Sequence, residues 1–497
     1  MKRRRESVLK IAVIIGCLLL AGAGVFFGAQ FVTKTGVFRV PGVVYYDDNL
    51  AEEERAAIAG VLEDDVVLDK DVIVKVRHEL ILPALAENER LVGVYVPVTG
   101  FYNDETDVVV SRADELWPNC DCGWRMIDVS ELDHTQKLLS INGRYYLDDY
   151  AGGAVFRIIS FESEKYAEEI SPLVGGLFQS EYPRAETVTT LAQTGVTAFS
   201  RLMNAKMDVV DSGEYFAAGL SDFLSEYDFV HTSSEASFYE AASRSGATGT
   251  PICSDPRFID TLKAIRLNIV ELTGNHNVDC GYKAAAETVD IYRENGIRIV
   301  GGGKNADEAA VPLVLVDGGS EVTLLAYNLS TGGATLGNYP GANQYYEEVA
   351  AAQIREAKAR GNLVIVDMQY YECSAYVSGI EDATCDSPAA TPGDEVGFFR
   401  HLVDLGADVV VGTSAHQPQT YELYGGGAIY YGLGNLFFDQ YRWPGTTRSL
   451  ILVHHIYNGK ILQTEVRPTQ YDGDFVPELL DAESSEAFLN RLKGSRP

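Results

Sequence analysis

Between residues 187 and 412, short apolar runs alternate with helical patterns, and this alternation limits the fold more than any other feature. The apolar runs have the length and the β-branched composition of strands. They are Thr187–Val196, Phe229–Thr232, Leu267–Leu272, Ile297–Val300, Val311–Val316, Val322–Tyr327, Leu363–Met368 and Val409–Gly412. The helical patterns among them are Tyr215–Ser225, Tyr282–Glu294, Tyr345–Ala359 and Glu395–Leu405. Strands joined by helices form largely parallel sheets with both faces buried, so we predict an α/β fold.

The last third of the chain is richer in strands than in helices. Its strand-like runs are Gln419–Tyr424, Ala428–Leu433, Ser449–His455 and Ile461–Arg467. They predict a second sheet layer, and therefore an α/β sandwich, which we place at residues 181–470. Residues 471–497 have the pattern of a short C-terminal helix followed by a tail.

The N-terminus carries the clearest signal for localisation. Five basic residues between positions 2 and 10 precede Ile11–Val32, an apolar run of 22 residues. A helix of about 20 residues spans a membrane core of about 30 Å. We predict that residues 1–32 are a basic cytoplasmic tip and a single transmembrane anchor, with the bulk of the chain outside the cytoplasm. A cleaved signal peptide is the alternative, because Ala21–Ala23 offers a small-residue cleavage site.

Residues 33–180 form a smaller region that mixes strand and helix patterns. The polar stretch Gln179–Glu186 is the best candidate for a linker between this region and the sandwich. Met126–Leu132 resembles a segment of periplasmic solute-binding-like domains. The region is therefore either solute-binding-like or an accessory α/β domain that positions the sandwich above the membrane.

The net charge and the cysteines limit the partners and the redox compartment that the chain can have. With 40 Lys and Arg against 71 Asp and Glu, the net charge is −31, which argues against nucleic-acid partners. Six cysteines follow the apolar run, and an even number in an exported chain permits disulfides. A Cys373–Cys385 bond would close a short loop, and a Cys253–Cys280 bond would pin the loop before residue 275. Cys120 and Cys122 are too close for an unstrained bond, so partners elsewhere stay open.

Polar residues gather where two of the predicted strands end. Thr273–Gly281 reads Thr-Gly-Asn-His-Asn-Val-Asp-Cys-Gly, and Gly412–Gln417 reads Gly-Thr-Ser-Ala-His-Gln. Because parallel strands end at a common sheet edge, we expect Asn275, His276 and His416 to converge there. Imidazole and amide side chains at such an edge are typical of a metal-assisted site.

Five blocks within residues 187–470 resemble, in order, the capsule-synthesis CapA family of poly-γ-glutamate capsule biosynthesis. Leu191–Arg201 is similar to its opening Gly-Asp-Val strand, and Asp228–Glu235 to its Asn-Leu-Glu strand. Gly274–Gly281 matches its Asn-Asn-His-x-x-Asp-Tyr-Gly segment, and Tyr282–Asn305 the segment after it. Leu433–Gln440 matches its end. The resemblance implies a calcineurin-like metallophosphoesterase fold.

The resemblance also implies which side chains hold metal. Glu235, Asn275, His276 and His416 keep the family's ligand chemistry. For His416 the competing interpretation is a hydrogen-bonded imidazole at the sheet edge. Three further polar residues are assigned structural roles. Asp279 is expected to cap the turn or helix that starts at Gly281, and Asn435 and Asp439 are expected to tie the sheet edge together.

Several expected ligands are replaced. Val196 stands where the family has aspartate, Ser233 replaces an asparagine, and Gln369 and Ser414 replace histidines. Glu235 then brings the only clear negative charge, which is too little to hold two dications.

A single divalent ion could still be held. Asp367 and Gln369 lie two residues apart, so both point to one strand face and could enclose one ion with His276, Asn275 and His416. Glu372 is a further candidate if the strand bulges. The competing interpretation of Asp367 is a cap or turn carboxylate that never approaches the site.

These patterns lead to one functional hypothesis and one competitor. We expect a membrane-anchored, extracytoplasmic protein that acts in synthesis, export or anchoring of a capsular polymer of the poly-γ-glutamate type, with that polymer or its machinery as partner. As an enzyme it would be a phosphoesterase-type hydrolase with one divalent ion (manganese, iron or zinc), and His276 would be a ligand or the proton donor. The competitor is a degenerate relative that binds polymer or partner proteins without metal.

Overall fold

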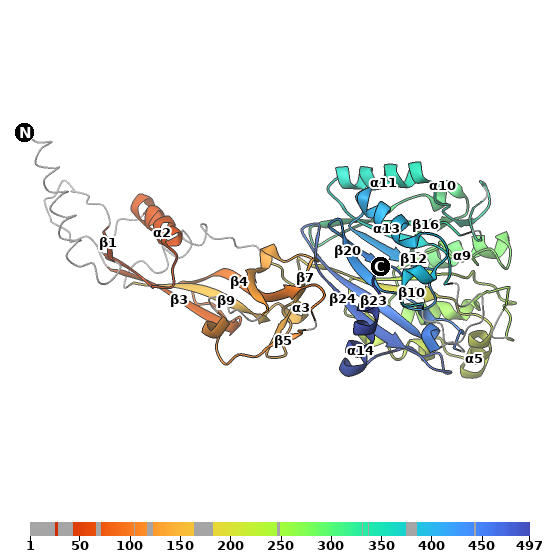
Figure 1. The fold of residues 1–497 in the computed structure, drawn as a ribbon, viewed down its shortest axis with the longest axis horizontal. Coiled ribbons are helices and arrows are strands. Elements are labelled where there is room, and N and C mark those ends of the chain that lie inside the picture. Colours follow the sequence, from red (N-terminus) through yellow and green to blue (C-terminus); the bar gives the residue numbers. More distant parts are fainter. Residues whose placement is uncertain are drawn as a thin grey trace, which may run out of the picture. The chain divides into compact units, whose positions relative to one another are not determined.

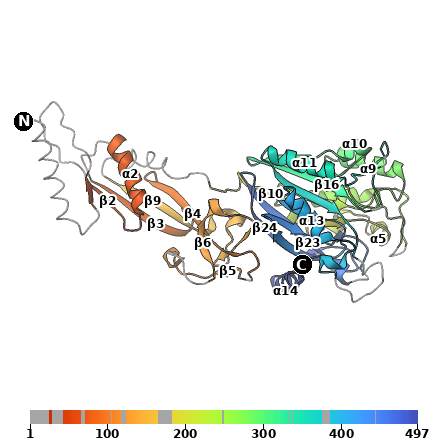
Figure 2. The same ribbon diagram turned by 45° about the horizontal axis from the view of Figure 1, so that its top comes forward.

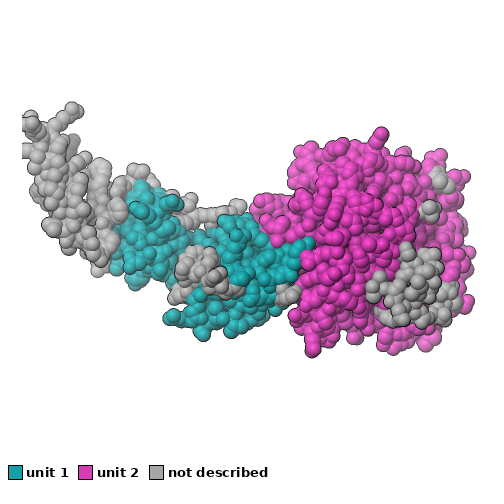
Figure 3. Space-filling view, viewed as in Figure 1, with its two compact units in different colours: residues 1–132, 136–184 teal, residues 133–135, 185–497 magenta. Residues whose placement is uncertain are grey.

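The structure divides into two compact units. The computed structural model describes residues 25–27, 43–65, 71–103, 105–116, 123–163, 182–245, 249–330, 332–335, 337–373, 385–441 and 444–497. The first unit comprises residues 1–132 and 136–184, and the second comprises residues 133–135 and 185–497 (Figure 3). The predicted linker Gln179–Glu186 and the cysteines at 120 and 122 lie partly or wholly outside the described residues.

The core of the first unit lies between a long helix and a mixed sheet. Helix α2 (Glu52–Asp65) contributes Ile58 and Leu62 to the core. Strand β3 buries alternate residues, Val72, Val74 and Val76, against them, as a strand with one covered face should. The sheet order is β1-β2-β3-β9-β4-β6, with β7 pairing β4. The bounds are β1 Val25–Phe27, β2 Val43–Tyr46, β4 Glu89–Gly100, β6 Arg125–Asp128, β7 Gln136–Leu138 and β9 Gly152–Glu162.

Most of the predicted transmembrane run Ile11–Val32 lies outside the described residues. Its described part, Val25–Phe27, is strand β1, antiparallel to β2, and not helix. Within the described residues, no helix combines the length and the apolar character that a membrane crossing requires.

The first sheet of the second unit joins four parallel strands to two long antiparallel ones. Its order is β13-β12-β11-β10-β23-β24-β25, and β22 also pairs β10. Strands β10 and β23 are far apart in the sequence but lie side by side (Figure 2). The bounds are β10 Thr189–Thr197, β11 Phe229–Ser234, β12 Ile269–Glu271, β13 Arg298–Val300, β22 Asn435–Phe437, β23 Arg448–Tyr457, β24 Lys460–Gln470 and β25 Glu478–Leu479.

The second sheet has four parallel inner strands and an antiparallel strand at each edge. Its order is β15-β16-β18-β19-β21-β20. The bounds are β15 Leu313–Asp317, β16 Ser320–Asn328, β18 Leu363–Gln369, β19 Val409–Gly412, β20 Tyr421–Tyr424 and β21 Gly427–Tyr430. The mainly parallel character of both sheets agrees with the predicted α/β class.

Helices cover the outer faces of the two sheets (Figure 1). Helices α5 (Leu202–Val210), α8 (Ile259–Ala264) and α9 (Tyr282–Glu294) pack on the first sheet, in a core that includes Val230 and Val270. Helices α11 (Glu347–Ala359) and α13 (Glu395–Asp404) pack on the second, around residues such as Val366 and Val410. The inner faces meet, because the side chains of Gln193 and Asp367 join β10 to β18.

Two expectations about the elements are wrong. The strand-rich last third does not build one layer: β20 and β21 extend the second sheet, whereas β23 and β24 extend the first. The helix expected at Tyr215–Ser225 is two short helices, α6 (Glu214–Ala217) and α7 (Ser221–Leu224). Gly219 separates them, and a Cβ there would lie 2.4 Å from the carbonyl oxygen of Pro477. The point between the two helices therefore lies against the backbone of Pro477, where only glycine fits.

Candidate metal centre

Four loops from both sheets meet at the carboxyl ends of their strands. Glu235 follows β11, Asn275 and His276 follow β12, Glu372 lies beyond the end of β18, and His416 lies beyond β19. The Nδ2 of Asn275 donates to Oε1 of Glu372 at 3.3 Å, which joins a loop of the first sheet to one of the second. The predicted convergence at strand ends is therefore present.

Two carboxylates and one imidazole form the centre of the site. His416 Nε2 lies 4.0 Å from Oε2 of Glu235 and 3.8 Å from Oε1 of Glu372. One ligand atom from each of the three residues lies within 4.8 Å of the others. Oxygen and imidazole donors at this spacing suit a divalent metal ion.

Glu235 is the most unusual of the three. Its side chain is 1% exposed, and neither carboxylate oxygen has a hydrogen-bond partner among the described residues. Burial raises the pKa of Glu235, and the charge of Glu372 adds to this, while the nearby imidazoles of His416 and His276 and a weaker contact with the amide of Gln369 partly offset it. A buried carboxylate without a donor is costly, and a bound cation would satisfy it.

The electrostatics of Glu372 and His416 are mutually supporting. Burial alone would raise the pKa of Glu372, but its contact with His416 and the charge of His276 bring it down to about 2. Burial likewise opposes protonation of His416, but Glu235 and Glu372 raise its pKa to about 9. Without metal, the imidazolium of His416 therefore neutralises part of the acidic charge.

Two substituted positions brace the loop that carries Glu372. Gln369 Nε2 donates to Oδ1 of Asn275 at 3.3 Å. The Oγ of Ser414 accepts from the backbone N–H of Tyr370 at 3.0 Å. Where the resemblance implies histidine ligands, these residues instead hold the backbone from which Glu372 reaches the site. Gln369 lies beside Asn275 as expected, and its role as a ligand stays a prediction.

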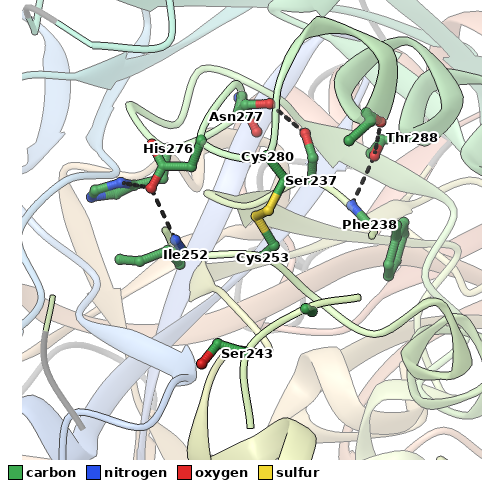
Figure 4. The surroundings of a disulfide bond; sticks show 12 residues. Ser237, Phe238, Ser243, Ile252, Cys253, His276, Asn277, Cys280 and Thr288 are labelled. Atoms are coloured by element: carbon green, nitrogen blue, oxygen red, sulfur yellow. Dashed lines mark hydrogen bonds and ion pairs between the residues drawn. A yellow bond between two sulfur atoms is a disulfide. The ribbon is translucent and has the colours of Figure 1, made fainter. Parts of the chain in front are cut away.

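His276 is oriented by a carboxylate and a disulfide-linked segment (Figure 4). Its Nδ1 lies 2.8 Å from Oδ2 of Asp279, which also accepts the backbone N–H of Ile252 at 2.9 Å. The Cys253–Cys280 disulfide joins the same two segments. Burial disfavours the imidazolium of His276, but Asp279 and the site carboxylates raise its pKa. Asp279 does not cap helix α9, which has no side-chain cap, so that expectation is wrong.

Gly274 lets the two loops of the first sheet touch. A Cβ at this position would lie 2.4 Å from Cα of Glu235. Directly beyond it, Ala236 and His276 form an isolated parallel bridge. The glycine of the Gly-Asn-His turn therefore serves a close backbone approach that brings His276 toward Glu235.

Asp367 does not join the metal-ligand group. It is fully buried in the middle of the sandwich, where Oδ1 accepts from Nε2 of Gln193 and Oδ2 lies 3.1 Å from Nε2 of His231. Asp367 shares a strand face with Gln369, as predicted. It lies two residues before the end of β18, however, and so is further inside the sandwich than the site. The competing interpretation is confirmed in that Asp367 stays away from the ligand group, but it is wrong about the cap or turn, since Asp367 lies within strand β18.

The place of the family's aspartate is apolar. Val196 belongs to a buried cluster with Ala198, Ala236, Ile252 and Phe438. No second ion can be held by such side chains. The donor set of Glu235, Glu372 and His416 therefore fits one divalent ion and not two.

Glu372 is the site residue that the sequence placed least well. Strand β18 does not bulge but ends at Gln369, and Glu372 reaches the site from the loop that follows. The Cys373–Cys385 disulfide fixes the chain directly after it. A carboxylate beside a cysteine three residues past a strand end was the only available signal.

The residues expected to tie the sheet edge do so. Asn435 accepts from His416 and donates to the carbonyl oxygen of Thr446 at 3.0 Å. Asp439 forms a buried ion pair with Arg201 and accepts the backbone N–H of Leu202 at 3.0 Å.

Comparisons with known proteins identify the family of this chain and several relatives. The family described as bacterial capsule synthesis protein PGA_cap matches residues 190–440. The capsule biosynthesis protein CapA of Bacillus anthracis is 28% identical over 42% of this chain and 50% of its own length. The PGA biosynthesis protein CapA of Bacillus subtilis is 27% identical over 42% of this chain and 52% of its own length. The chain thus spans about half the length of the curated relatives it matches.

A third relative is a probable polyglutamine synthesis accessory protein of Mycobacterium tuberculosis. It is 31% identical over 38% of this chain and 50% of its own length. Among solved structures, the amidase from Nesterenkonia sp. AN1 aligns with 63% of this chain and 99% of its own at 14% identity and a TM-score of 0.22, which supports no inference.

Proposed function

Because the chain belongs to the bacterial capsule synthesis family PGA_cap, we propose that its second unit is a metal-dependent hydrolase that acts in synthesis, export or anchoring of a capsular polymer. The Bacillus relatives are named for capsule or PGA biosynthesis, which supports a polymer of the poly-γ-glutamate type. The two facing sheets with strand-end ligands support a metallophosphoesterase-like fold. The polymer or its synthesis machinery would be the partner.

The observation that carries this proposal is the buried Glu235 without hydrogen-bond partners, beside Glu372 and His416. These three side chains would hold one divalent ion such as manganese, iron or zinc. A divalent ion held there supplies a Lewis acid that polarises a carbonyl or phosphoryl oxygen. The bond that is cleaved is then a phosphoester or an amide-type bond.

The neighbouring residues divide the remaining work. His276 faces the carboxylate of Asp279, which favours the imidazolium and suits His276 to donate a proton from Nε2 to the leaving group. Asn275 is held between Gln369 and Glu372, so its amide is fixed at the rim of the site. Its role is to orient the substrate.

We extend the proposal to the location of the protein. The basic N-terminus and the apolar run Ile11–Val32 support a single-pass membrane anchor with the two units outside the cytoplasm. The Cys253–Cys280 and Cys373–Cys385 disulfides are consistent with an oxidising compartment.

Metal analysis of the detergent-purified full-length protein tests the proposal. After chelation, reloading and dialysis, we expect about one manganese, iron or zinc ion per chain. Glu235→Gln should lose the ion, because it removes a ligand charge at almost constant shape. Glu395→Gln is the matched control, since Glu395 is also buried (2% exposed) but lies on α13 outside the site. A wild-type protein that retains no ion would overturn the hydrolase assignment.

One observation favours a second candidate, a relative that binds polymer or partner proteins without chemistry. The apolar cluster around Val196 has replaced a ligand position of the family. This candidate predicts no tightly held ion, and it predicts that Glu235→Gln leaves polymer binding unchanged. Turnover of an aryl phosphate or a γ-glutamyl anilide by the metal-loaded wild type, lost in His276→Ala, would exclude it.

A further inference from the structure

The amide of Asn435 has only one orientation that satisfies its surroundings. Its Nδ2 lies 3.0 Å from the backbone carbonyl oxygen of Thr446, which can only accept a hydrogen bond. A second acceptor, Oε1 of Gln440, lies 3.2 Å from the same nitrogen. The Oδ1 of Asn435 must therefore face His416 Nδ1, 2.9 Å away.

This orientation determines which nitrogen of His416 carries hydrogen. An amide oxygen cannot donate, so Nδ1 of His416 must be the donor. In the neutral ring the lone pair then lies on Nε2, the nitrogen that faces Glu235 and Glu372. Both Asn435 and His416 are buried (0% and 2% exposed), so water does not compete for these bonds.

The two imidazoles of the site consequently have different partners. His276 faces the carboxylate of Asp279, which stabilises a positive ring. His416 faces the neutral amide of Asn435, which fixes a tautomer without adding negative charge. Any oxygen acceptor at Nδ1 can fix the tautomer of a metal-binding imidazole, and the amide of Asn435 does so while remaining neutral.

We propose that Asn435 is a positioning residue that holds His416 in the Nδ1-protonated tautomer and so selects its Nε2 as a metal ligand. The metal part of this inference rests on the proposed function, whereas the tautomer does not. Asn435 acts from β22, through Thr446 and Gln440, and touches neither substrate nor metal.

Zinc binding of the full-length protein, measured by calorimetry, tests the metal part. Asn435→Leu keeps the approximate volume but removes the acceptor, and we expect zinc to bind roughly 10 to 100 times more weakly. Asn204→Leu is the matched control, because Asn204 is also fully buried and donates to backbone carbonyls, here of Ser243 and Cys253.

Two results would overturn the metal part. In one, Asn435→Leu keeps wild-type zinc affinity. In the other, Asn204→Leu weakens zinc binding as much as Asn435→Leu does, which would make the effect a general loss of packing.

The tautomer is read separately by 15N NMR of histidine rings, which is practical because the chain has only eight histidines. In metal-free protein, once alkaline titration has converted the ring of His416 to its neutral form, we expect hydrogen on Nδ1 in wild type and a mixture of tautomers in Asn435→Leu. Hydrogen on Nε2 in the wild type would overturn the proposal. If the wild type binds no zinc but shows the Nδ1 tautomer, the proposed function fails while the positioning role stands.

Discussion

Ile252 and His276 share one carboxylate oxygen, Oδ2 of Asp279. The backbone N–H of Ile252 donates to it at 2.9 Å, and Nδ1 of His276 lies 2.8 Å away. The residues next to Ile252 and Asp279 are the disulfide partners Cys253 and Cys280. A covalent bond and a carboxylate thus hold the same two segments together, and His276 is positioned from the clamp they form.

Removing the charge of Asp279 should weaken the imidazolium of His276. Asp279→Asn keeps an oxygen that can accept from both Ile252 and His276, so we expect the fold to persist. The pKa of His276 should fall, because the side-chain bond and charge of Asp279 raise it in the wild type. NMR titration of the His276 ring measures this shift. An unchanged pKa would show that Asp279 orients the ring without tuning its protonation.

Removing the disulfide should loosen the clamp. The bond joins residues 27 positions apart, and deleting it through Cys253→Ser with Cys280→Ser should cost roughly 2–4 kcal/mol of unfolding free energy. We also expect faster hydrogen exchange at the amide of Ile252, because its acceptor Asp279 is no longer tethered. The double variant Cys373→Ser with Cys385→Ser is the control, which should leave exchange at Ile252 slow. If hydrogen exchange at the amide of Ile252 were equally slow in both double variants, the Cys253–Cys280 disulfide would not be what holds Ile252 against Asp279.

Glu235 should impair the stability of the metal-free protein. Its carboxylate is buried without a well-formed hydrogen bond, since Gln369 makes only a weak contact, and its pKa is raised first by burial. In chelator we therefore expect Glu235→Gln to have a higher urea midpoint than wild type. Its unfolding free energy should be larger by about 1 kcal/mol or more. The stability advantage of Glu235→Gln over wild type should grow as the pH rises, because the wild type must then keep an ionised carboxylate buried. Added manganese should stabilise only the wild type, and the reverse pattern would remove Glu235 from the metal site.

The sequence predicted the fold better than it predicted the site. Helix α9 has the predicted bounds, Tyr282–Glu294, because an amphipathic pattern and a preceding glycine are local signals. Asp367 and Glu372 show where local signals end. The two-residue alternation of a strand correctly placed Asp367 and Gln369 on one face. How far Asp367 lies from the strand end, and therefore from the site, depends on how the two sheets pack, which no local pattern encodes. The position of Glu372 depends on where β18 stops and how its loop is braced.

His454 should make the unfolding free energy depend on pH, whether or not a metal ion is bound. It is fully buried between Thr464, whose Oγ1 lies 2.8 Å from Nδ1, and Gln193, whose Oε1 lies 3.3 Å from Nε2. Burial, and then the neighbouring charges of His455 and His231, lower its pKa to about 3. In the unfolded chain the ring takes up a proton near pH 6.5.

Protonation of His454 therefore favours the unfolded chain, and its contribution to stability is complete only above about pH 6.5. As the pH falls from there toward 3, unfolding free energy should drop by up to roughly 1.4 kcal/mol per pH unit from this one group. His454→Gln should remove that part of the slope in urea titrations between pH 6.5 and 4. His401→Gln is the control, because the side chain of His401 is 46% exposed. In this variant the unfolding free energy should still fall with pH as it does in wild type. A slope that is the same in His454→Gln and wild type would mean that His454 is already protonated in the folded protein, and the buried network around it would need a counter-charge.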